Sequence, residues 1–432
     1  MRITIVGTGY VGLVAGTCFA EIGNDVVGLD VDEGKVAKLN KGELTIFEPG
    51  LFDLFSRNLR EKRLSFTTNY DKAVAHAQVM FLCLPTPPAE DGSADTRHVL
   101  SAAREIAKRM DCYKVIVSKS TVPIGTHKEI AAEIRKHYKG EFSIASNPEF
   151  LKEGTAVEDF LKPDRVVLGV QDEKAWQILS TLYEPYCRTG APIMRMDPAS
   201  SEMTKYAANA FLATKISFMN EIARLCEKTN ADVDLVRMGI SKDGRIGSAF
   251  LFPGIGYGGS CFPKDTRALV QSGKQHGLEM KVVDAAEQVN DEQKLILIER
   301  MRKHFGSLSG KRFAIWGLAF KPRTDDVREA PALALIQQLL AAKAKVQCFD
   351  PEAMATAKRV LGNKVTYTKD AYSALDGADA LVLATEWNEF RMPDWDRVKK
   401  LLKTPVVFDG RNIYRPDYVR EQGFVYYGIG KP

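Results

Sequence analysis

The chain has 432 residues, of which 45% are hydrophobic and 27% charged, and it carries a formal net charge of +5 at pH 7. That length predicts about two to three globular domains, and so small a charge, with lysines and arginines interspersed among acids, excludes the basic stripe of a nucleic-acid-binding protein. The seven cysteines stand singly and no apolar stretch approaches the ~18 residues that span a bilayer, so the sequence predicts a cytoplasmic protein without a metal site, a disulfide framework or a membrane segment.

The first predicted elements form a dinucleotide-binding pattern. A buried strand over residues 3–7 leads into Gly7-Thr8-Gly9-Tyr10-Val11-Gly12, and a helix over 13–22 and a strand over 25–29 follow. The glycines permit a tight turn at which the helix N-terminus binds a pyrophosphate, and Asp30 would bind the adenosine ribose. The charge of Asp30 favours NAD over NADP because it would repel a 2′-phosphate, a repulsion that Lys35 would partly offset. The alternative is a glycine-rich turn of another α/β fold.

Further buried strands are predicted at 78–84, 114–119, 142–145 and 165–170, so the first part of the chain is expected to form a doubly wound domain. Two of these strands precede polar segments, at the sheet edge where doubly wound folds bind ligands. Thr121 would hydrogen-bond a cofactor or a water, or only cap the next helix. Glu149 and Glu153 would accept protons or orient hydroxyl groups, or form only a solvated helical face.

A long amphipathic helix is predicted from about Ser200 to Lys228, after Pro198. Such a helix would bridge two domains or pack against a partner subunit. Lys205 and Asn209 lie four residues apart and therefore project from one face. A desolvated Lys205 would stabilise a developing oxyanion, whereas the alternative is a lysine that snorkels to the surface.

The segment Gly258-Gly259-Ser260-Cys261-Phe262-Pro263-Lys264-Asp265 combines a thiol with close glycines, a cation and a carboxylate. The glycines permit a ligand to approach the main chain, and Lys264 favours the nucleophilic thiolate. Asp265 would position the water that hydrolyses an adduct on sulfur. By itself the segment also fits an inert buried cysteine in a turn. The six histidines lie away from these clusters, so a histidine base has little support.

A second α/β unit is predicted from about Gly310, with strands at 313–317, 345–350, 380–384 and 406–409 and a helix at 330–342. Its first turn, Gly317 to Lys321, lacks the second and third glycines of the dinucleotide pattern. A second dinucleotide site is therefore not expected, although the strand ends still offer a nucleotide cleft. The similar architecture of the two halves suggests a duplication.

Together these motifs resemble those of the nucleotide-sugar 6-dehydrogenase family and occur in the order seen in that family. The resemblance covers residues 1 to about 411. The resemblance is carried by Gly7–Gly12 with Asp30, Ser120–Pro123, Asn147–Leu151, Lys205 with Asn209, Gly258–Asp265 and Gly317–Lys321. Within the family, Phe250–Gly254 points to the UDP-glucose branch, and the GDP-mannose and UDP-N-acetylhexosamine branches are the alternatives. A non-catalytic NAD-binding sensor is the alternative of a different class.

The resemblance implies a four-electron oxidation of C6 to the acid, with two NADH formed per sugar. Cys261 would attack the C6 aldehyde to give a thiohemiacetal, and a second oxidation would give a thioester. Lys205 and Asn209 would stabilise the oxyanions. Asp265, helped by Thr121, would hold the water that cleaves the thioester.

The resemblance also implies the binding residues. Glu149 and Glu153 would move protons and contact the sugar. The cofactor would be bound by Gly7, Gly9, Val11, Gly12, Asp30, Lys35, Thr86, Thr121, Glu153, Lys264 and Arg328. The substrate would be bound by Glu149, Phe150, Leu151, Lys152, Glu153, Lys205, Asn209, Arg245, Phe250, Leu251, Phe252, Pro253, Gly254, Gly258 and Lys321.

The resemblance further implies three domains and a homodimer. Residues 1–197 would form the NAD-binding Rossmann domain, 198–305 a central helical region for dimerisation and the active site, and 306–432 a Rossmann-like domain for the UDP-sugar. The long helix would form the dimer core, and Arg245 would reach the partner's site. Pro322-Arg323, directly after Lys321, is a departure from the family pattern at a position where members vary. It would alter the hinge of the nucleotide site.

Overall fold

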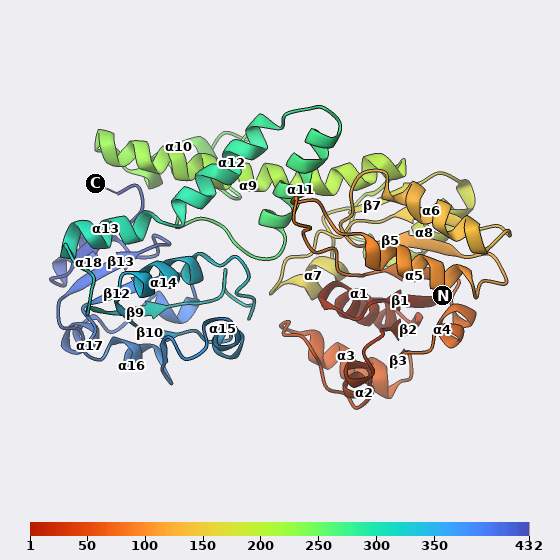
Figure 1. Ribbon diagram of the computed structural model, residues 1–432, viewed down its shortest axis with the longest axis horizontal. Coiled ribbons are helices and arrows are strands. Elements are labelled where there is room, and N and C mark those ends of the chain that lie inside the picture. Colours follow the sequence, from red (N-terminus) through yellow and green to blue (C-terminus); the bar gives the residue numbers. More distant parts are fainter. Residues whose placement is uncertain (432) are drawn as a thin grey trace. The chain divides into compact units, whose positions relative to one another are not determined.

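The computed structural model describes residues 1–431. The chain divides into two compact units, each with its own sheet (Figure 1). Unit 1 comprises Met1–Ala208 with Gln271–Leu278, and unit 2 comprises Asn209–Val270 with the described residues from Glu279 on. The expected α/β class with two Rossmann-like sheets and a long helix is confirmed.

Unit 1 contains an eight-stranded sheet in the order β3-β2-β1-β4-β5-β6-β7-β8. Its strands are β1 (Arg2–Val6), β2 (Asp25–Leu29), β3 (Leu64–Thr67), β4 (Val79–Leu82), β5 (Val115–Ser118), β6 (Ser143–Ser146), β7 (Val166–Val170) and β8 (Ile193–Met196). Its helices are α1 (Tyr10–Glu21), α2 (Glu33–Asn40), α3 (Leu51–Arg60), α4 (Tyr70–His76), α5 (Arg97–Ala107), α6 (Thr126–His137), α7 (Ala156–Leu161) and α8 (Glu173–Tyr183). Neighbouring strands are parallel except β7, which runs antiparallel to β6.

Unit 2 contains a six-stranded parallel sheet in the order β11-β10-β9-β12-β13-β14. Its strands are β9 (Arg312–Trp316), β10 (Lys345–Phe349), β11 (Thr366–Tyr367), β12 (Ala380–Leu383), β13 (Val406–Asp409) and β14 (Val425–Tyr427). Its helices are α10 (Val233–Ser241), α12 (Lys281–Gln293), α13 (Ile296–Phe305), α14 (Pro331–Ala341), α15 (Met354–Leu361), α16 (Ala371–Leu375), α17 (Trp395–Leu401) and α18 (Pro416–Glu421). The six strands repeat the order of the first six of unit 1, in keeping with the suggested duplication.

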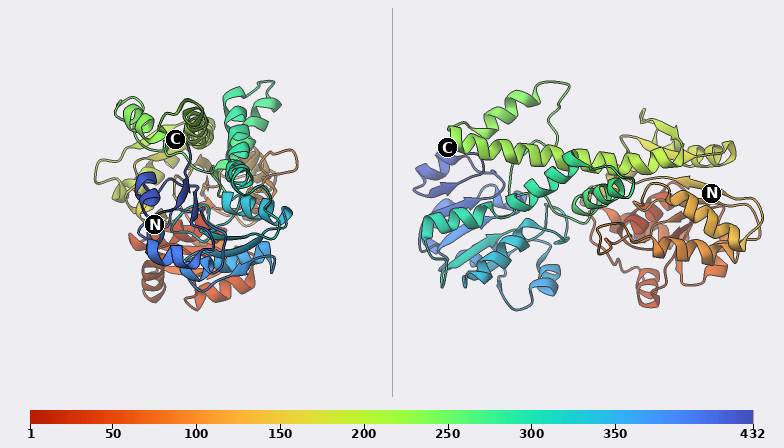
Figure 2. Two further views of the ribbon diagram at one scale, coloured as in Figure 1. Left: turned by 90° about the vertical axis from the view of Figure 1, so that its left-hand side faces the viewer. Right: turned by 45° about the horizontal axis from the view of Figure 1, so that its top comes forward.

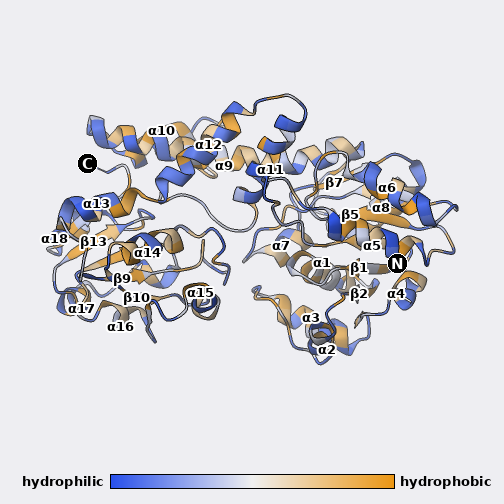
Figure 3. Cartoon of the chain, viewed as in Figure 1, coloured by the Kyte–Doolittle hydropathy of each residue, from blue (hydrophilic) through white to orange (hydrophobic). Residues whose placement is uncertain are grey.

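Burial explains why these segments become central strands. Every residue of β4, β5, β6 and β7 is buried, as expected of parallel-type strands covered on both faces by helices. Figure 3 shows the strands coloured mainly as hydrophobic and helices such as α6 with residues of both kinds. Several helices begin at an aspartate or asparagine whose side chain accepts a backbone N–H, as Asp32 does from Lys35.

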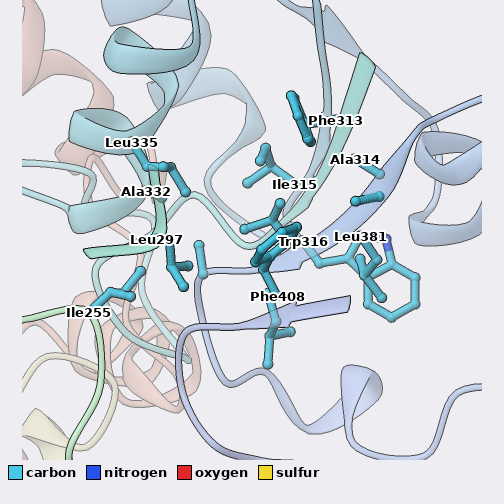
Figure 4. Close-up of a cluster of buried hydrophobic side chains, with 14 of the residues drawn as sticks. Ile255, Leu297, Phe313, Ala314, Ile315, Trp316, Ala332, Leu335, Leu381 and Phe408 are labelled. Atoms are coloured by element: carbon cyan, nitrogen blue, oxygen red, sulfur yellow. The ribbon is translucent and has the colours of Figure 1, made fainter. Parts of the chain in front are cut away.

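The core of unit 2 surrounds β9 and its neighbours. Phe313, Ile315 and Trp316 of β9 are almost fully buried, as is Phe408 of β13. Figure 4 shows these side chains together with Ala332 and Leu335 of α14. This packing fixes the carboxyl ends of the strands, where Gly317 and the following residues begin the next turn.

The long helix α9 (Pro198–Thr229) has 32 residues and is the long yellow-green helix of Figure 2. The boundary between the units falls within it, after Ala208. Helix α11 (Phe262–Gln275) likewise belongs to both units. Pro198 is the first residue of α9 rather than a residue before it, because proline suits the first helical turn, where its missing N–H is not needed. None of the helices within residues 1–431 is long and apolar enough to cross a membrane.

Candidate active site

The turn after β1 has the geometry of a dinucleotide-binding turn. Gly7 has a φ of +96°, which a residue with a side chain rarely adopts. A Cβ on Gly12 would lie 1.9 Å from the Gly7 carbonyl oxygen, whereas one on Gly9 would meet nothing within 4 Å. Gly7 and Gly12 therefore close the turn, and Gly9 leaves its outer face open.

Asp30, at the end of β2, is fixed against this turn. Its Oδ2 accepts hydrogen bonds from the Thr8 backbone N–H at 2.9 Å and the Thr8 hydroxyl at 2.6 Å, and it lies 3.0 Å from Lys35 Nζ. Partial burial raises the pKa of Asp30, but the hydrogen bonds from Thr8 and Lys35 outweigh it and leave the pKa below its ordinary value. The open glycine turn and the ionised carboxylate at its side fit NAD.

Thr121 follows β5 and lies beside Thr86. The Thr86 hydroxyl donates to the Thr121 carbonyl oxygen at 2.9 Å. Thr121 does not cap α6, because Gly125 occupies that position with a φ of +99°. The free N–H groups of α6 are instead satisfied by buried Glu202 of α9, which accepts from Gly125 N at 2.6 Å and from His127 N at 2.9 Å. Glu202 therefore holds the Thr121 segment to α9.

Glu149 and Lys205 form a buried ion pair in unit 1. Glu149 Oε1 lies 3.3 Å from Lys205 Nζ, and the two side chains are 8% and 5% exposed. The interpretation of Glu149 and Glu153 as a solvated helical face is wrong, because residues 147–152 lie outside any helix and Glu149 is buried. The interpretation of Lys205 as a snorkelling lysine is wrong as well, because its charge is paired inside the protein. The ring of Phe150 lies 5.4 Å from Lys205 Nζ.

The segment after Glu149 is tied to the dinucleotide turn by Glu48. This buried carboxylate accepts from the Tyr10 hydroxyl at 2.5 Å, from Gly154 N at 2.7 Å and from Ala156 N at 2.8 Å. Tyr10 is the first residue of α1, directly after Gly9. Glu48 thereby joins the turn to the segment that contains Glu153.

Cys261 lies directly before α11. It is exposed, and its carbonyl oxygen accepts from Asp265 N at 2.8 Å, so it occupies the cap position of the helix. A thiol at a helix N-terminus is favoured as the thiolate. A Cβ on Gly258 would lie 2.3 Å from the Glu329 carbonyl oxygen, and one on Gly259 would lie 2.8 Å from the Phe320 ring. Both glycines are thus needed for the turn that presents the thiol, and the alternative of an inert buried cysteine is wrong.

Asp265 is the buried acid of unit 2. Its side chain is 1% exposed, and its two oxygens contact Asn209 Nδ2 at 2.7 Å and Lys264 Nζ at 2.5 Å. Asn209 lies one turn after Lys205 on α9. Lys205 and Asn209 thus meet different carboxylates, Glu149 in unit 1 and Asp265 in unit 2.

The segment Phe250–Gly254 is held rigidly in unit 2. Asn220 Oδ1 accepts from Gly254 N at 2.8 Å, and Gln293 Nε2 donates to the Gly254 carbonyl oxygen at 2.7 Å. Phe252 is 63% exposed beside the Arg237 guanidinium, which lies 4.4 Å from its ring. The rigid segment therefore presents an exposed aromatic ring.

The predicted residues Arg245, Arg328 and Lys321 are charged residues of unit 2, and Arg328 borders the Cys261 turn, because its carbonyl oxygen accepts from Gly259 N at 2.8 Å. Arg245 is 90% exposed and pairs only with its neighbour Asp243 among the contacts described here. Arg328 is 64% exposed beside Asp326, and Lys321 Nζ lies 5.4 Å from the Phe320 ring. Within residues 1–431, no group of three or more His, Cys, Asp or Glu side chains has an arrangement that could hold a metal ion.

Three family models match the chain in succession. They are described as the NAD binding domain, the central domain and the UDP binding domain of the UDP-glucose/GDP-mannose dehydrogenase family, and they match residues 1–187, 199–292 and 314–416. The chain belongs to this family. The predictions of an NAD-dependent oxidoreductase and of a nucleotide-sugar dehydrogenase are thereby confirmed.

Full-length relatives of this dehydrogenase family include a UDP-glucose 6-dehydrogenase of Rhizobium meliloti (strain 1021), 47% identical over 100% of both chains. The UDP-glucose 6-dehydrogenase TuaD of Bacillus subtilis (strain 168) is 44% identical over 100% of this chain and 93% of its own. Among solved structures, a UDP-glucose dehydrogenase from Pyrobaculum islandicum is 40% identical, with a TM-score of 0.93 over 100% of this chain and 98% of its own.

The roles of four residues that support this site were not predicted from the sequence: Glu48, Glu202, Asn147 and Lys119, whose Nζ donates to Asn147 Oδ1 at 3.0 Å. Each is buried and acts through a partner distant in the sequence, so no local pattern marks its role. A signal existed for Lys119, since a lysine that directly continues an apolar strand must be paired or desolvated. Asn147 stood in a motif that was noticed, but without a role of its own.

Proposed function

We propose that this dehydrogenase oxidises C6 of UDP-glucose to the acid, giving UDP-glucuronate, through a covalent adduct on Cys261. The observation that carries the proposal is the exposed thiol at the N-terminus of α11, four residues before a buried Asp265 that Asn209 and Lys264 hold in place. Relatives 44–47% identical over the whole chain that are named UDP-glucose 6-dehydrogenases, and a solved structure 40% identical that is named a UDP-glucose dehydrogenase, support the choice of substrate.

Different residues of the site would act in different steps of the oxidation. When bound, NAD⁺ supplies the hydride acceptor, and two NAD⁺ are consumed per sugar. The Cys261 sulfur adds to the C6 aldehyde carbon, and the resulting oxyanion is stabilised by Lys205 and Asn209. In the adduct C6 is tetrahedral and carries an oxygen that can expel the hydride as the thioester forms, whereas the trigonal carbon of a free aldehyde cannot give up its hydrogen as hydride without first adding a nucleophile. Covalent capture also prevents escape of the reactive aldehyde.

Oxidation of the thiohemiacetal leaves a thioester on Cys261, which water then cleaves. Asp265, with Thr121, would hold that water, whose oxygen bonds to C6 while the C6–sulfur bond breaks and the thiol is regenerated. Glu149 and Glu153 would accept protons released in these steps. The overall change consumes one UDP-glucose, one water and two NAD⁺, and yields UDP-glucuronate, two NADH and three protons.

The binding residues are proposed on the same basis. NAD would be bound at the glycine turn and Asp30, with Val11, Lys35, Thr86, Thr121, Glu153, Lys264 and Arg328. The nucleotide sugar would be bound by Glu149–Glu153, Lys205, Asn209, Phe250–Gly254, Gly258 and Lys321. Exposed Phe252 and the fixed backbone of Gly254 support this use of the segment.

We further propose a cytoplasmic homodimer with the three domains given by the sequence, 1–197, 198–305 and 306–432. The support for the dimer is an apolar stripe on α9, in which Phe211, Phe218 and Leu225 recur every seven residues and are 66%, 51% and 58% exposed. A single helix rarely presents such a stripe to water. Arg245 would reach the partner's site from its exposed loop.

The test is product stoichiometry with separate nucleotide sugars. UDP-glucose should yield two NADH per sugar, and GDP-mannose or a UDP-N-acetylhexosamine should yield little. Cys261→Ala should form no acid while binding NAD with nearly unchanged affinity. One NADH per sugar, or full turnover by Cys261→Ala, would reject the thioester route. Preference for another nucleotide sugar would reassign the substrate.

A further inference from the structure

We infer that Glu287 of α12 is a positioning residue, which holds Cys261 for attack on the sugar by fixing both ends of the Gly258–Asp265 segment. The inference rests on the proposed function, because it gives Glu287 a part in the steps that occur on sulfur. Its evidence is a set of contacts within unit 2, in which one carboxylate binds the residues directly before and directly after that segment.

The Glu287 carboxylate bridges the two ends of the Gly258–Asp265 segment. Its Oε2 accepts at 3.1 Å from the hydroxyl of Tyr257, the residue before the segment. The same oxygen accepts at 2.7 Å from the hydroxyl of Thr266, the residue after the segment. Both side chains are buried, Tyr257 at 6% and Thr266 at 0% exposure, and hydrogen bonds to a carboxylate are strong in such surroundings. One oxygen atom therefore ties together the two ends of the span that contains the thiol.

The other oxygen of Glu287 connects the segment to the chain that packs on its glycines. Glu287 Oε1 lies 2.9 Å from Arg267 Nε, and Arg267 Nη1 donates to Glu329 Oε1 at 3.2 Å. The Glu329 carbonyl oxygen lies so close to Gly258 that a Cβ there would approach it to 2.3 Å. Partial burial lowers the pKa of Arg267, but the charges of Glu287 and Glu329 outweigh it and leave the pKa above its ordinary value. Arg267 is thus a charged link between the two carboxylates.

The same face of α12 holds the backbone on the amino-terminal side of the thiol. Asn290, one turn after Glu287, accepts from Tyr257 N at 2.8 Å and donates to the Tyr257 carbonyl oxygen at 3.2 Å. Gln293, a further turn on, donates to the Gly254 carbonyl oxygen at 2.7 Å. Residues three apart lie on one face of a helix. This face therefore fixes both the segment with the thiol and the segment proposed to bind the nucleotide sugar.

The proposed chemistry requires a sulfur atom in a fixed position. Sulfur has to approach C6 to within about 3–3.5 Å in the right direction, and a misplacement of about 1 Å can cost a hundredfold in rate. The adduct then has to persist while one NADH leaves and a second NAD⁺ binds. Cys261 is exposed, and packing supports an exposed side chain only weakly. The position of the sulfur consequently depends on the backbone at both sides of it, which Glu287 holds.

The experiment compares two reactions of the C6 aldehyde of UDP-glucose in Glu287→Met, with saturating aldehyde and cofactor. Oxidation to the acid consumes one NAD⁺ and one water and requires the sulfur, whereas reduction to UDP-glucose consumes one NADH and one proton and requires no bond to sulfur. Methionine keeps the length of glutamate and removes both acceptor oxygens. Oxidation should slow by about tenfold or more, and reduction should keep its rate. The absorbance of NADH measures both.

Glu292→Met is the matched control. It removes the same charge from the same helix, but Glu292 is 67% exposed and pairs with Arg224 Nη1 at 2.6 Å instead of contacting the Cys261 segment. Both reactions of the aldehyde should keep the rates of the wild type in this variant.

A general structural role for Glu287 gives a different result, because it would slow both reactions alike. Equal slowing of the two, or no slowing of the oxidation, would overturn the inference. If Glu287→Met does not fold, Tyr257→Phe removes one of the two hydroxyl groups and should slow only the oxidation, by a smaller factor. Cys261→Ala tests the proposed function separately. It should lose the oxidation completely and keep the reduction, whatever the result for Glu287.

Discussion

Several polar residues of this protein directly follow a strand, and their burial determines their chemistry. Lys119 follows β5, Asp30 follows β2, and Asn147 follows β6. The carboxyl ends of parallel strands converge on one edge of a sheet, so polar groups from distant parts of the chain meet there. The chemistry of each group then depends on the number of charges and hydrogen bonds around it.

Lys119 should make folding stability depend on pH. Its pKa is lowered from 10.5 to about 8 in the folded chain. Between these pH values the unfolded chain holds a proton that the folded chain has lost, so the lysine's contribution becomes more favourable as pH rises. Below pH 8 Lys119 is protonated in both the folded and the unfolded chain, and burial of its charge then lowers the free energy of unfolding by about 3 kcal/mol.

Urea unfolding of the wild type and Lys119→Met at pH 7 and pH 10 measures this effect. The free energy of unfolding of the wild type should gain on that of the variant by up to about 3 kcal/mol as pH rises through this range. A constant difference between the two proteins at both pH values would show that Lys119 keeps an ordinary pKa.

Gly12 and Gly9 should respond differently to alanine. A Cβ at residue 12 would lie 1.9 Å from the Gly7 carbonyl oxygen, whereas one at residue 9 meets nothing within 4 Å. Gly12→Ala should therefore lower the free energy of unfolding by about 3 kcal/mol and abolish NAD binding. Gly9→Ala should keep the melting temperature of the wild type. Calorimetry of the two variants, with and without NAD, checks both statements, and equal melting temperatures would contradict them.

Sequence reasoning at this scale succeeded where a local motif carries the geometry. The spacing of Gly7, Gly12 and Asp30 predicted the turn and its acid, and the glycines before Cys261 predicted an approachable thiol. It failed for Glu48 and Glu202, because their partners lie about a hundred and about seventy-five residues away along the chain, as for Glu48 with Gly154 and Glu202 with His127.

At the scale of elements, buried carboxylates fasten loops to helices. Glu202 of α9 supplies the acceptors that the N-terminus of α6 lacks, and Glu48 does the same for α7 while also holding Tyr10. Because each carboxylate accepts several hydrogen bonds in a buried place, a change of one atom leaves donors without partners. The loops that contain Thr121 and Glu153 therefore owe their order to residues outside them.

Glu48→Gln should loosen the segment around Gly154. The new amide nitrogen would face donors instead of accepting from them, at a cost of about 1–3 kcal/mol. Hydrogen exchange of residues 152–156 should become faster, and KM for the nucleotide sugar should rise more than kcat falls. Tyr10→Phe is the control, since it removes only one of the bonds and leaves the backbone N–H groups paired. Unchanged exchange in Glu48→Gln would disprove this role.

The elements themselves were predicted unevenly. Long apolar runs such as those of β1, β5 and β13 were found to within about two residues. Strands β3, β8, β11 and β14 were missed, because they are short and partly exposed and lie toward the sheet edges. The helix after the glycine turn begins at Tyr10 rather than at residue 13, because the last residues of the glycine motif, Tyr10 to Gly12, already belong to the helix.

At the scale of the whole molecule, assembly is the open expectation. Phe218→Lys places a charge at the centre of the α9 stripe and should convert a dimer into a monomer, measured by light scattering over a range of concentrations. The monomer should also lose activity, because Arg245 would no longer reach a partner's site. Met392→Lys is the control, since Met392 is 90% exposed away from α9. A dimer that survives Phe218→Lys would place the interface elsewhere.

The sequence predicted the two sheets and the helix between them because each follows from repeated local patterns. It did not predict the antiparallel β7, because the direction of a strand depends on the connection that precedes it and leaves no trace in its own residues. The division of α9 between the two units was equally invisible, since its periodicity continues without a break across residue 208.

That continuity limits how the chain can change during evolution. Each residue turns a helix by about 100°, so one amino acid inserted between positions 205 and 209 would swing the amine and the amide onto different faces. Deletions would do the same, whereas a replacement that preserves length would leave the angular phase intact. The residues between Lys205 and Asn209 should therefore tolerate replacement better than insertion or deletion.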